Sequence, residues 1–398
     1  MGATAQATHS AVSQRKAGLP QGIVVVFAAF LPILAIVALA PVVPRLVEAF
    51  SDVPGASTLV PLAVVAPGLM IALFSPLMGW LADRYGRRKL LLVATFFYGI
   101  VGVAPYFLLD LRAIFASRLA LGLCEAAILT VTNTLIGDYY DHNERRLWLT
   151  VQGLVGPIFG TSTVAFAGYM AAVAWQIPFL IYLIAFPILL AMVAFIFEPE
   201  VAVHAEDSAE RTSPFPWRHV IITSLVTFFC ASLYYVYIVQ IGLAFSAIGL
   251  NDPGRVGLLI SLASIGVFLG AVLFQIVSGR FSFIVQIGIF LALLGIGLCG
   301  IGLSHSQSAM TSAAFVQQLG AGILIPSLVL WTVAGLPVRH RGRGMGIWSG
   351  CFFLGQFGSP LLVTMTSGMV GSLLGSFAVL GAFALVGSVY AFVRKATS

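Results

Sequence analysis

The sequence feature that most constrains this chain is a succession of twelve apolar runs separated by short polar breaks. A helix needs roughly 20 apolar residues to cross the hydrocarbon core of a bilayer, and each run reaches that length. The composition agrees, because 60% of the 398 residues are hydrophobic and 9% are charged, against about 25% charged residues in soluble domains. A chain in lipid must satisfy its backbone hydrogen bonds internally. We therefore predict an all-α membrane protein with twelve transmembrane helices.

A short and strongly charged break lies between the second and third runs, where Gly79 to Lys89 reads Gly-Trp-Leu-Ala-Asp-Arg-Tyr-Gly-Arg-Arg-Lys. Its position predicts a turn between two transmembrane helices, with an acid near the end of the first helix. Basic residues alone could serve to hold a loop on the cytoplasmic side. That role needs neither the acid nor the glycines, which permit sharp turns and close backbone approach. We therefore predict a gating loop formed by Gly79, Asp83, Arg84, Gly86, Arg87 and Arg88.

The longest polar break, residues 198–217, contains five acidic residues and little that could pack. It predicts a solvated linker between two halves of six helices each. A shorter segment at residues 278–281, Ser-Gly-Arg-Phe, stands in the second half where a worn copy of the charged loop is expected. The predicted division is a tail at 1–22, a six-helix bundle at 23–197, the linker at 198–217, a second bundle at 218–394 and a tail at 395–398.

The distribution of basic residues predicts the orientation of the chain. With both termini on one side, sixteen of the twenty Lys and Arg residues fall in segments on that side and three in loops on the other. Cytoplasmic loops carry such an excess of Lys and Arg. We therefore expect both termini in the cytoplasm and a multi-pass protein of the plasma membrane, which is the inner membrane if the source is bacterial. The net charge of +6 then reflects topology and implies no nucleic-acid partner.

The Gly79–Lys89 stretch closely resembles the loop signature between helices 2 and 3 of the major facilitator superfamily. This resemblance covers the chain from Ile23 to Lys395 and implies two pseudo-symmetric six-helix bundles that alternate access around a central site. In the fourth run, Arg118 and Gly122 resemble the superfamily's Arg-x-x-x-Gly element, which is linked to proton transfer. Leu121 stands where the family often has Gln.

The fifth run carries a second family element, which consists of Gly153, Gly156, Pro157 and Gly160. It is similar to the Gly-Pro-x-x-Gly element of the superfamily's antiporters, although Thr161 stands where the family often has another glycine. This resemblance implies the twelve-helix drug:proton antiporter branch. Close helix packing in a Gly-rich membrane protein is the alternative explanation of these residues.

Arg118 and Glu125 are the basic and acidic residues that fall at membrane depth. Each costs about 2.5–3.5 kcal/mol on insertion scales, so each is a functional candidate. A spacing of seven residues puts both on one helical face, about 10 Å apart along the axis. We expect this face to look into the cavity between the halves, where desolvation favours a protonated Glu125 and Arg118 favours its ionised form. The alternative is a buried polar clamp, with Arg118 bound to backbone carbonyls.

Uncharged polar residues at membrane depth are the candidates for the wall of the substrate cavity. A cavity with amides and rings but little charge suits a small apolar or amphipathic substrate better than a polyanion or a metal ion. The predicted cavity residues are Asn133, Gln152, Tyr234, Tyr237, Gln240, Gln317, Gln318 and Gln356.

Several classes of protein are excluded by missing motifs. None of the three lysines lies in a Gly-x-x-x-x-Gly-Lys loop, so an ATP-driven pump is excluded. No catalytic constellation and no metal-ligand spacing of the four cysteines occurs, so we predict no enzyme, no metal and no cofactor. We predict a monomeric secondary transporter, a proton-coupled exporter of a small apolar or amphipathic molecule. The alternative is a symporter or uniporter that takes up a sugar, organic acid or related metabolite.

Overall fold

The computed structural model of the protein describes residues 17–199, 214–337 and 340–396. The described residues form α-helices and two 3₁₀ segments. In chain order these are α1 (Leu19–Val37), α2 (Val43–Ala49), α3 (Ala56–Tyr85), α4 (Arg87–Val103), η1 (Ala104–Tyr106), α5 (Leu111–Tyr139), α6 (His142–Val173), η2 (Ile177–Ile184), α7 (Ala185–Phe195), α8 (Trp217–Ala247), α9 (Pro253–Ser278), α10 (Phe283–Gly302), α11 (Gln307–Ala334), α12 (Arg341–Val370) and α13 (Leu373–Ala396).

Twelve of the helical segments in the described part of the chain are long and apolar enough to cross a membrane, which confirms the predicted all-α membrane fold. The sixth of them combines η2 with α7. The short helix α2 follows α1 after a turn at residues 38–42, and it carries Pro44 in its first turn. Proline fits there because the first N–H groups of a helix have no partner inside it.

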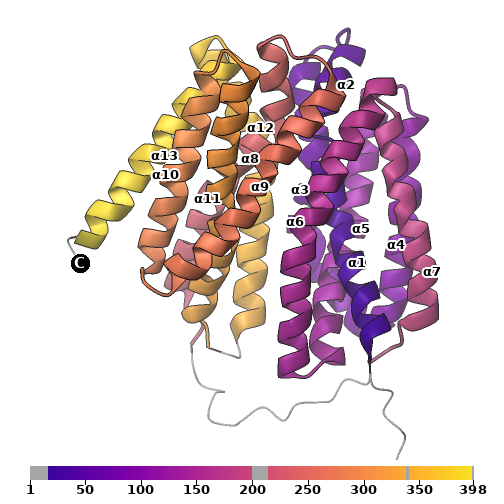
Figure 1. The fold of residues 1–398 in the computed structure, drawn as a ribbon. Coiled ribbons are helices and arrows are strands. Elements are labelled where there is room, and N and C mark those ends of the chain that lie inside the picture. The colour runs from indigo at the N-terminus through magenta and orange to yellow at the C-terminus, as the bar shows by residue number, and fades with distance from the viewer. Residues whose placement is uncertain (1–16, 200–213, 338–339, 397–398) are drawn as a thin grey trace, which may run out of the picture.

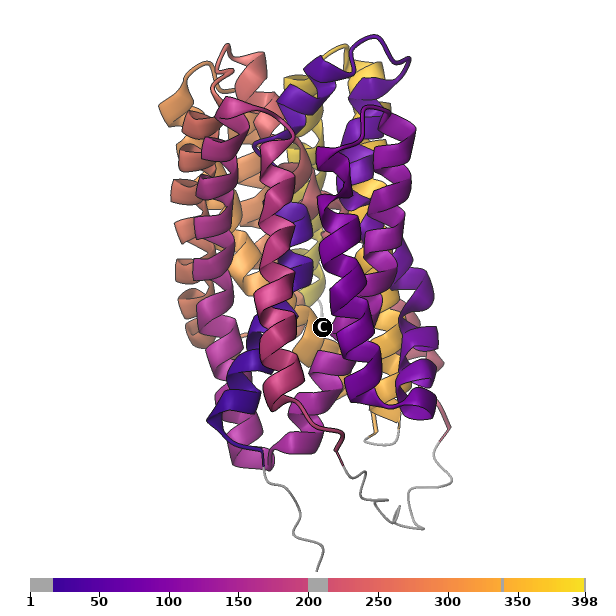
Figure 2. The ribbon, with the colours of Figure 1, turned by 90° about the vertical axis from the view of Figure 1, so that its right-hand side faces the viewer.

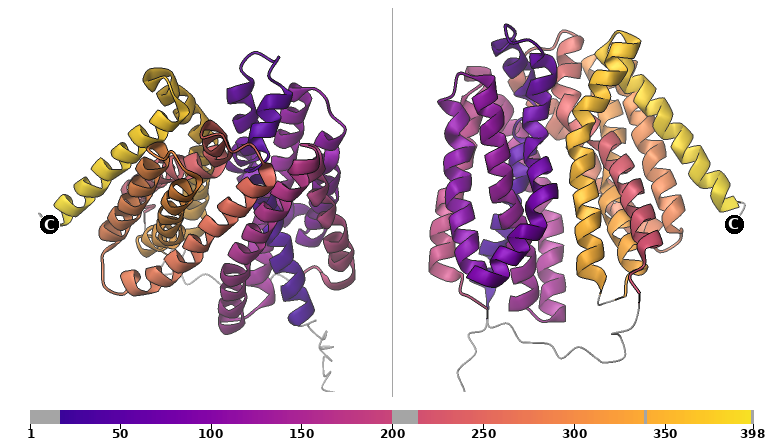
Figure 3. Two further views of the ribbon diagram at one scale, coloured as in Figure 1. Left: turned by 45° about the horizontal axis from the view of Figure 1, so that its top comes forward. Right: turned by 180° about the vertical axis from the view of Figure 1, so that it is seen from behind.

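The helices form two bundles that lie side by side. Helices α1–α7 make the N-terminal bundle and α8–α13 the C-terminal bundle (Figure 1). We call the end where α7 finishes and α8 starts the linker end, and the opposite end, which carries α2, the far end. In Figure 2, which views the molecule from the side of the N-terminal bundle, its long helices run between these two ends. Helix α13 tilts away from the bundle towards its own C-terminal end (Figure 3).

The described boundaries differ slightly from those expected from the sequence. Helix α1 starts at Leu19, inside the expected N-terminal tail, and α13 continues to Ala396. Within the expected linker, residues 200–213 lie outside the described residues, whereas α8 already starts at Trp217.

The most extensive contacts between the two bundles are those of α6 with α9 and of α3 with α12, and α8 also touches α1, α2 and α3. Glycine makes the first contact close, because a Cβ atom at Gly168 would lie 2.5 Å from the Pro253 carbonyl oxygen. Ser261 donates a hydrogen bond to the Thr161 carbonyl oxygen at 2.9 Å in the same pair. Each of these residues lies in the part of its helix nearer the far end. Helices α6 and α9 accordingly meet near the far end and diverge towards the linker end (Figure 1).

Candidate functional site

A cavity of about 410 Å³ lies between the two bundles. Helices α1, α3, α5 and α6 line it from the N-terminal bundle, and α8, α9, α11 and α12 line it from the C-terminal bundle. Most of the lining side chains are aliphatic or aromatic, and none of the described residues that line it is Asp, Glu, Lys or Arg. Its volume falls within the range of about 300–1,000 Å³ that is usual for small-molecule sites. The cavity can therefore enclose a small molecule with a largely apolar surface.

Four of the eight predicted cavity residues line this cavity, namely Gln152, Tyr234, Tyr237 and Gln318. The Tyr237 hydroxyl and the Gln318 Oε1 atom are buried and have no hydrogen-bond partner among the described residues. Tyr235, the neighbour of Tyr234, also lines the cavity. The C-terminal bundle thus supplies most of the polar groups around the cavity.

The other four predicted cavity residues lie elsewhere. Asn133 is exposed, whereas Gln240 and Gln317 are buried but absent from the lining of the cavity. Gln356 lies where α3 crosses α12, and a Cβ atom at Gly68 would come within 2.8 Å of its Nε2 atom. The depth of a residue along a helix can be judged from sequence, but the direction in which it points depends on how the helix is rotated.

The α1 wall of the cavity is apolar, and polarity in the sequence did not predict it. Phe30, Ile33, Ile36 and Val37 line the cavity from this helix. Their spacing of three, four and seven residues marks one face of a helix. The signal is hidden because α1 is apolar on all its faces, so no polar contrast distinguishes the face at the cavity from the one packed inside the bundle.

The predicted antiporter element on α6 lies largely at the cavity. Gly156, Pro157 and Gly160 line it, whereas Gly153 is exposed and a Cβ atom there would meet nothing within 4 Å. A Cβ atom at Gly156 would lie 3.3 Å from the Phe30 ring. The glycines therefore bring α6 close to α1 at the height of the cavity.

Arg118 is 1% exposed and lies inside the N-terminal bundle. Its guanidinium donates hydrogen bonds to the Tyr182 hydroxyl at 2.9 Å and to the Gly102 carbonyl oxygen at 3.0 Å. It also lies over the rings of Phe179 and Tyr182, an arrangement that stabilises a desolvated cation. These contacts agree with the alternative considered from the sequence, in which Arg118 is a buried polar clamp bound to backbone carbonyls.

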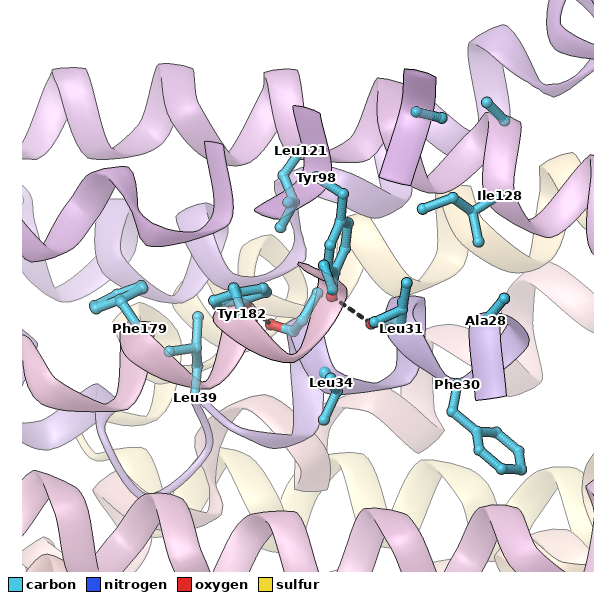
Figure 4. Packing of buried hydrophobic residues seen from close by; sticks show 14 of the residues in the cluster. Ala28, Phe30, Leu31, Leu34, Leu39, Tyr98, Leu121, Ile128, Phe179 and Tyr182 are labelled. Carbon is cyan, nitrogen blue, oxygen red and sulfur yellow. Dashed lines mark hydrogen bonds between the residues drawn. The ribbon is translucent and has the colours of Figure 1, made fainter. Parts of the chain in front are cut away.

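Glu125 is fully buried, and neither of its carboxyl oxygens has a hydrogen-bond partner among the described residues. The sequence had led us to expect the Glu125 and Arg118 side chains at the cavity, but neither lines it, whereas Leu129, one turn further along α5, does. Helix α1 presents Phe30 to the cavity and accepts the Tyr98 hydrogen bond at Leu31 on its opposite face (Figure 4).

The predicted gating loop spans the end of α3 and the start of α4. Gly86 is the residue that separates the two helices. Gly86 has a φ of +95°, which disfavours any residue with a Cβ atom. Asp83, with a 75% exposed side chain, lies 3.8 Å from the Arg87 guanidinium. Arg87 is itself mostly buried and forms a second ion pair with Asp138 of α5.

The remaining residues of this loop lie at its edges. Gly79 is on α3, and a Cβ atom there would be 3.8 Å from the Thr130 side chain. Arg84 is exposed, with its guanidinium over the rings of Trp80 and Tyr85. Arg88 donates a hydrogen bond to the Ile196 carbonyl oxygen at 2.7 Å.

Glu198 also contacts the gating loop, although the sequence predicted it to belong to a solvated linker. Its carboxylate accepts hydrogen bonds from the backbone N–H groups of Arg87 at 2.6 Å and Arg88 at 2.9 Å. These are first-turn groups of α4, which have no partner within the helix. Glu198 therefore caps α4 and fixes the segment after α7 to the gating loop. Asp138 and Glu198 were missed because both lie near predicted helix ends, where an acidic residue is ordinary.

Solved structures of transporters share the fold of the whole chain. A D-xylose-proton symporter has a TM-score of 0.78 at 14% identity, with 94% of this chain and 96% of that chain covered. An auto-inhibited POT family peptide transporter has a TM-score of 0.76 at 11% identity, with 96% and 97% covered. At these identities the likeness concerns the fold alone.

Two curated relatives are named as transporters. The 3-(3-hydroxy-phenyl)propionate transporter of Escherichia coli (strain K12) is 26% identical over 316 residues, which cover 74% of this chain and 75% of the relative. A triacylglyceride transporter of Mycobacteroides abscessus is 30% identical over 107 residues, which span 25% of this chain and about a fifth (21%) of that relative.

The model of the Major Facilitator Superfamily matches residues 25–251 and 223–398, which together cover nearly the whole chain. With the twelve spanning helices and the two bundles around a central cavity, this match assigns the chain to the Major Facilitator Superfamily, as a transporter and not an enzyme.

Proposed function

We propose that the protein is a proton-coupled exporter that moves a small, uncharged, apolar or amphipathic molecule by alternating access. The observation that carries this proposal is the lining of the cavity, which encloses about 410 Å³ without a charged side chain among the described lining residues. A buried charge without a partner is costly, so an apolar cavity disfavours a charged substrate. Closure at the far end and divergence at the linker end are consistent with one of the two states that alternating access requires.

The lining of the cavity also favours some of the substrate classes that the names of the similar transporters suggest over others. These classes are sugars, carboxylates and hydrophobic molecules. A sugar needs many hydrogen-bond partners, and a carboxylate needs a cation, but the basic residue at membrane depth, Arg118, lies outside the cavity. A hydrophobic molecule is compatible with this wall, as is the class of substrate named for the triacylglyceride transporter. We therefore place the substrate among uncharged molecules with few polar groups.

Glu125 is the proposed proton carrier and Arg118 its electrostatic partner. A carboxyl that is fully buried and has no hydrogen-bond partner among the described residues is costly in its ionised form. Because Glu125 lies outside the cavity lining, substrate and proton do not compete for one place. The coupling that we propose is indirect and acts through α5, which carries Glu125 and contributes Leu129 to the cavity lining.

Export and orientation rest on the sequence together with the position of α6. The antiporter-like element supplies Gly156, Pro157 and Gly160 to the cavity wall. The excess of basic residues at the linker end favours a cytoplasmic linker and termini, and hence a cavity that loads from the cytoplasm in the state described. We propose a monomer in the plasma membrane.

The experiment that tests this proposal is transport in proteoliposomes under a pH gradient of either sign. Chloramphenicol, an uncharged amphipathic aromatic, is the first probe, with D-xylose and 3-(3-hydroxyphenyl)propionate as polar and anionic comparisons. An antiporter accumulates the probe when the vesicle interior is acidic, whichever way the protein is inserted. Accumulation only with an acidic exterior would instead establish symport. Transport of the sugar or the acid but not of the uncharged probe would contradict the proposed substrate class.

The matching variant is Glu125→Gln, which imitates a permanently protonated carboxyl. It is expected to abolish accumulation driven by the pH gradient and to retain exchange of substrate down its own gradient. Cys124→Ser, one position away on α5, is the control and should keep gradient-driven accumulation. If Glu125→Gln still accumulates substrate, another group carries the proton.

A further inference from the structure

Aromatic side chains line the cavity on the side of the C-terminal bundle. Among the described lining residues six are aromatic, and all of them except Phe30 belong to α8 or α12. We call four of these the aromatic wall, namely Tyr234, Tyr235, Phe352 and Phe353. The Tyr235 ring centroid lies 5.1 Å from that of Tyr234 and 5.8 Å from that of Phe352. The Phe352 and Phe353 centroids are 5.6 Å apart. Rings in contact with one another favour a further aromatic ring over a saturated group.

Two buried polar atoms of the lining have no hydrogen-bond partner among the described residues, the Gln318 Oε1 atom and the Tyr237 hydroxyl. Gln318 is 5% exposed and Tyr237 is 1% exposed. No other described residue of the lining has such an atom. A hydroxyl can donate or accept a hydrogen bond, whereas an amide oxygen only accepts one. Gln318 therefore makes the sharper demand, because a ligand must bring an N–H or O–H group to it.

The backbone that carries Gln318 is fixed by the close packing of α11 against α9. A Cβ atom at Gly266 would lie 2.5 Å from the Phe315 carbonyl oxygen and 3.2 Å from the Gln318 Cβ atom. A Cβ atom at Gly270 would collide with the Leu319 carbonyl oxygen. The two helices thus meet at their backbones on either side of Gln318. A recognition group that is held in place before binding loses little freedom when the ligand arrives.

We propose that Gln318 and the aromatic wall select, among uncharged molecules, planar aromatic substrates that carry a hydroxyl or N–H group. This rests on the proposed function, which places the substrate in this cavity. Both features belong to one cavity of about 410 Å³, so a single small molecule meets them together. A ligand without a donor leaves the buried Gln318 oxygen unpaired, which corresponds to a loss of about 5- to 150-fold in affinity. A saturated ligand forgoes the ring contacts, which corresponds to about 2- to 12-fold.

Three bicyclic probes of similar size test the two demands separately. 2-Naphthol has both the rings and the donor, 2-methoxynaphthalene has the rings without the donor, and trans-decahydro-2-naphthol has the donor without aromatic rings. Their affinities are measured by isothermal titration calorimetry with the protein in lipid nanodiscs, and the heat from empty nanodiscs is subtracted. The pH is kept near neutral, because a phenol ionises only near about pH 10. The wild-type protein should bind 2-naphthol about 5- to 150-fold more tightly than 2-methoxynaphthalene, and about 2- to 12-fold more tightly than the saturated alcohol.

Gln318→Leu removes the acceptor and keeps a side chain of similar size. It should bring the ratio of the affinities for 2-naphthol and 2-methoxynaphthalene close to one and leave the preference for aromatic rings in place. Gln317→Leu is the matched control, because Gln317 is the neighbouring amide on α11, is buried and does not line the cavity. It should keep the wild-type ratio. Both probes are measured on the same preparation, so a partly inactive sample leaves the ratio unchanged.

Phe352→Leu tests the aromatic wall, because it removes the ring that contacts both Tyr235 and Phe353. It should reduce the preference for 2-naphthol over the saturated alcohol and keep the preference for the donor. Phe229→Leu is the control, since the Phe229 ring on α8 contacts Phe383 and does not line the cavity. It should retain both preferences.

Each outcome bears on one part of this inference. If 2-naphthol does not bind, if the wild-type protein binds 2-methoxynaphthalene equally well, or if Gln318→Leu keeps the wild-type ratio, Gln318 is not the selecting group. A preference for rings that persists in Phe352→Leu would overturn the aromatic wall. These measurements use no pH gradient, so they hold whether or not transport is coupled to protons. Accumulation by Glu125→Gln would overturn the proposed coupling and leave the selection by Gln318 standing.

Discussion

At the scale of single residues, Gly122 decides how closely α5 packs against α3. A Cβ atom at this position would lie 2.5 Å from the Pro67 carbonyl oxygen and 2.6 Å from the Pro67 Cα atom. Both are backbone atoms, which cannot turn aside as a side chain can. The absence of a side chain therefore sets the position of the helix that carries Arg118 and Glu125. In the sequence, Gly122 was singled out because it resembles part of a family element linked to proton transfer. Its packing gives it a separate physical role, which is to allow the close approach of α5 to α3.

Gly122→Ala is therefore expected to destabilise the protein, and Gly153→Ala is the matched control. Overpacking a well-packed site costs about 1–3 kcal/mol, so Gly122→Ala should lower the midpoint of thermal unfolding in detergent. At Gly153 an added methyl group meets nothing within 4 Å, and Ala is more favourable than Gly in a helix by about 0.5–1 kcal/mol. Equal unfolding midpoints for the two variants would contradict the close approach of α5 and α3.

Asp83 tests the gating role of the charged loop. Its side chain is 75% exposed and lies 3.8 Å from Arg87, so the pair should contribute less than about 1 kcal/mol to stability. Asp83→Asn is therefore expected to fold normally, to retain substrate affinity, and to transport more slowly because the balance between states changes. Turnover and affinity are measured together in proteoliposomes. Wild-type turnover would leave the loop with a topological role only.

At the scale of elements, the start of α4 depends on a residue far away in sequence. Glu198 follows α7, and its carboxylate accepts the N–H groups of Arg87 and Arg88. A negative group at a helix N-terminus is also favoured by the helix dipole. This contact joins the gating loop to the last transmembrane segment of the N-terminal bundle, so the two should move as one body.

Glu198→Ala is expected to loosen this end of α4. Loss of an N-terminal cap costs about 0.5–2 kcal/mol, and hydrogen exchange at residues 88–91 should become faster. Glu48→Ala is the control, because Glu48 forms an exposed ion pair with Arg45 three residues away, and such pairs contribute little. Unchanged exchange at the start of α4 in Glu198→Ala would show that the cap is dispensable.

At the scale of the whole molecule, the two bundles make their close contacts away from the linker end. Thr58 of α3 and Thr364 of α12 illustrate this, because their hydroxyls are 3.3 Å apart across the bundle interface. In an alternating-access cycle these two helices must separate at the far end when the cavity opens there.

A disulfide across this pair should therefore arrest transport. In a variant without the four native cysteines, Thr58→Cys combined with Thr364→Cys is expected to lose transport on oxidation and to regain it on reduction. Each single substitution is the control and should transport under both conditions. Transport by a fully cross-linked protein would contradict a cycle that opens the far end between α3 and α12.

The sequence by itself determined the twelve candidate spanning helices, because length and hydrophobicity are local properties of the chain. It also indicated their grouping into two bundles, through the long polar break at residues 198–217. It also located the ionisable residues at membrane depth, since Arg118 and Glu125 stand out in an apolar run. Gln152, Tyr234, Tyr237 and Gln318 were found at the cavity for the same reason, because polarity at membrane depth is visible in the sequence.

Only the tertiary structure decided which way these residues point. Glu125 and Arg118 lie buried inside the N-terminal bundle and not at the cavity. Helix α1 is apolar on every side, so nothing in its sequence distinguishes the face that meets Tyr98 from the face that meets the cavity. Glu198 likewise caps a helix more than a hundred residues earlier. The rotation of a uniformly apolar helix is set by its neighbours, and those exist only once the bundle has assembled.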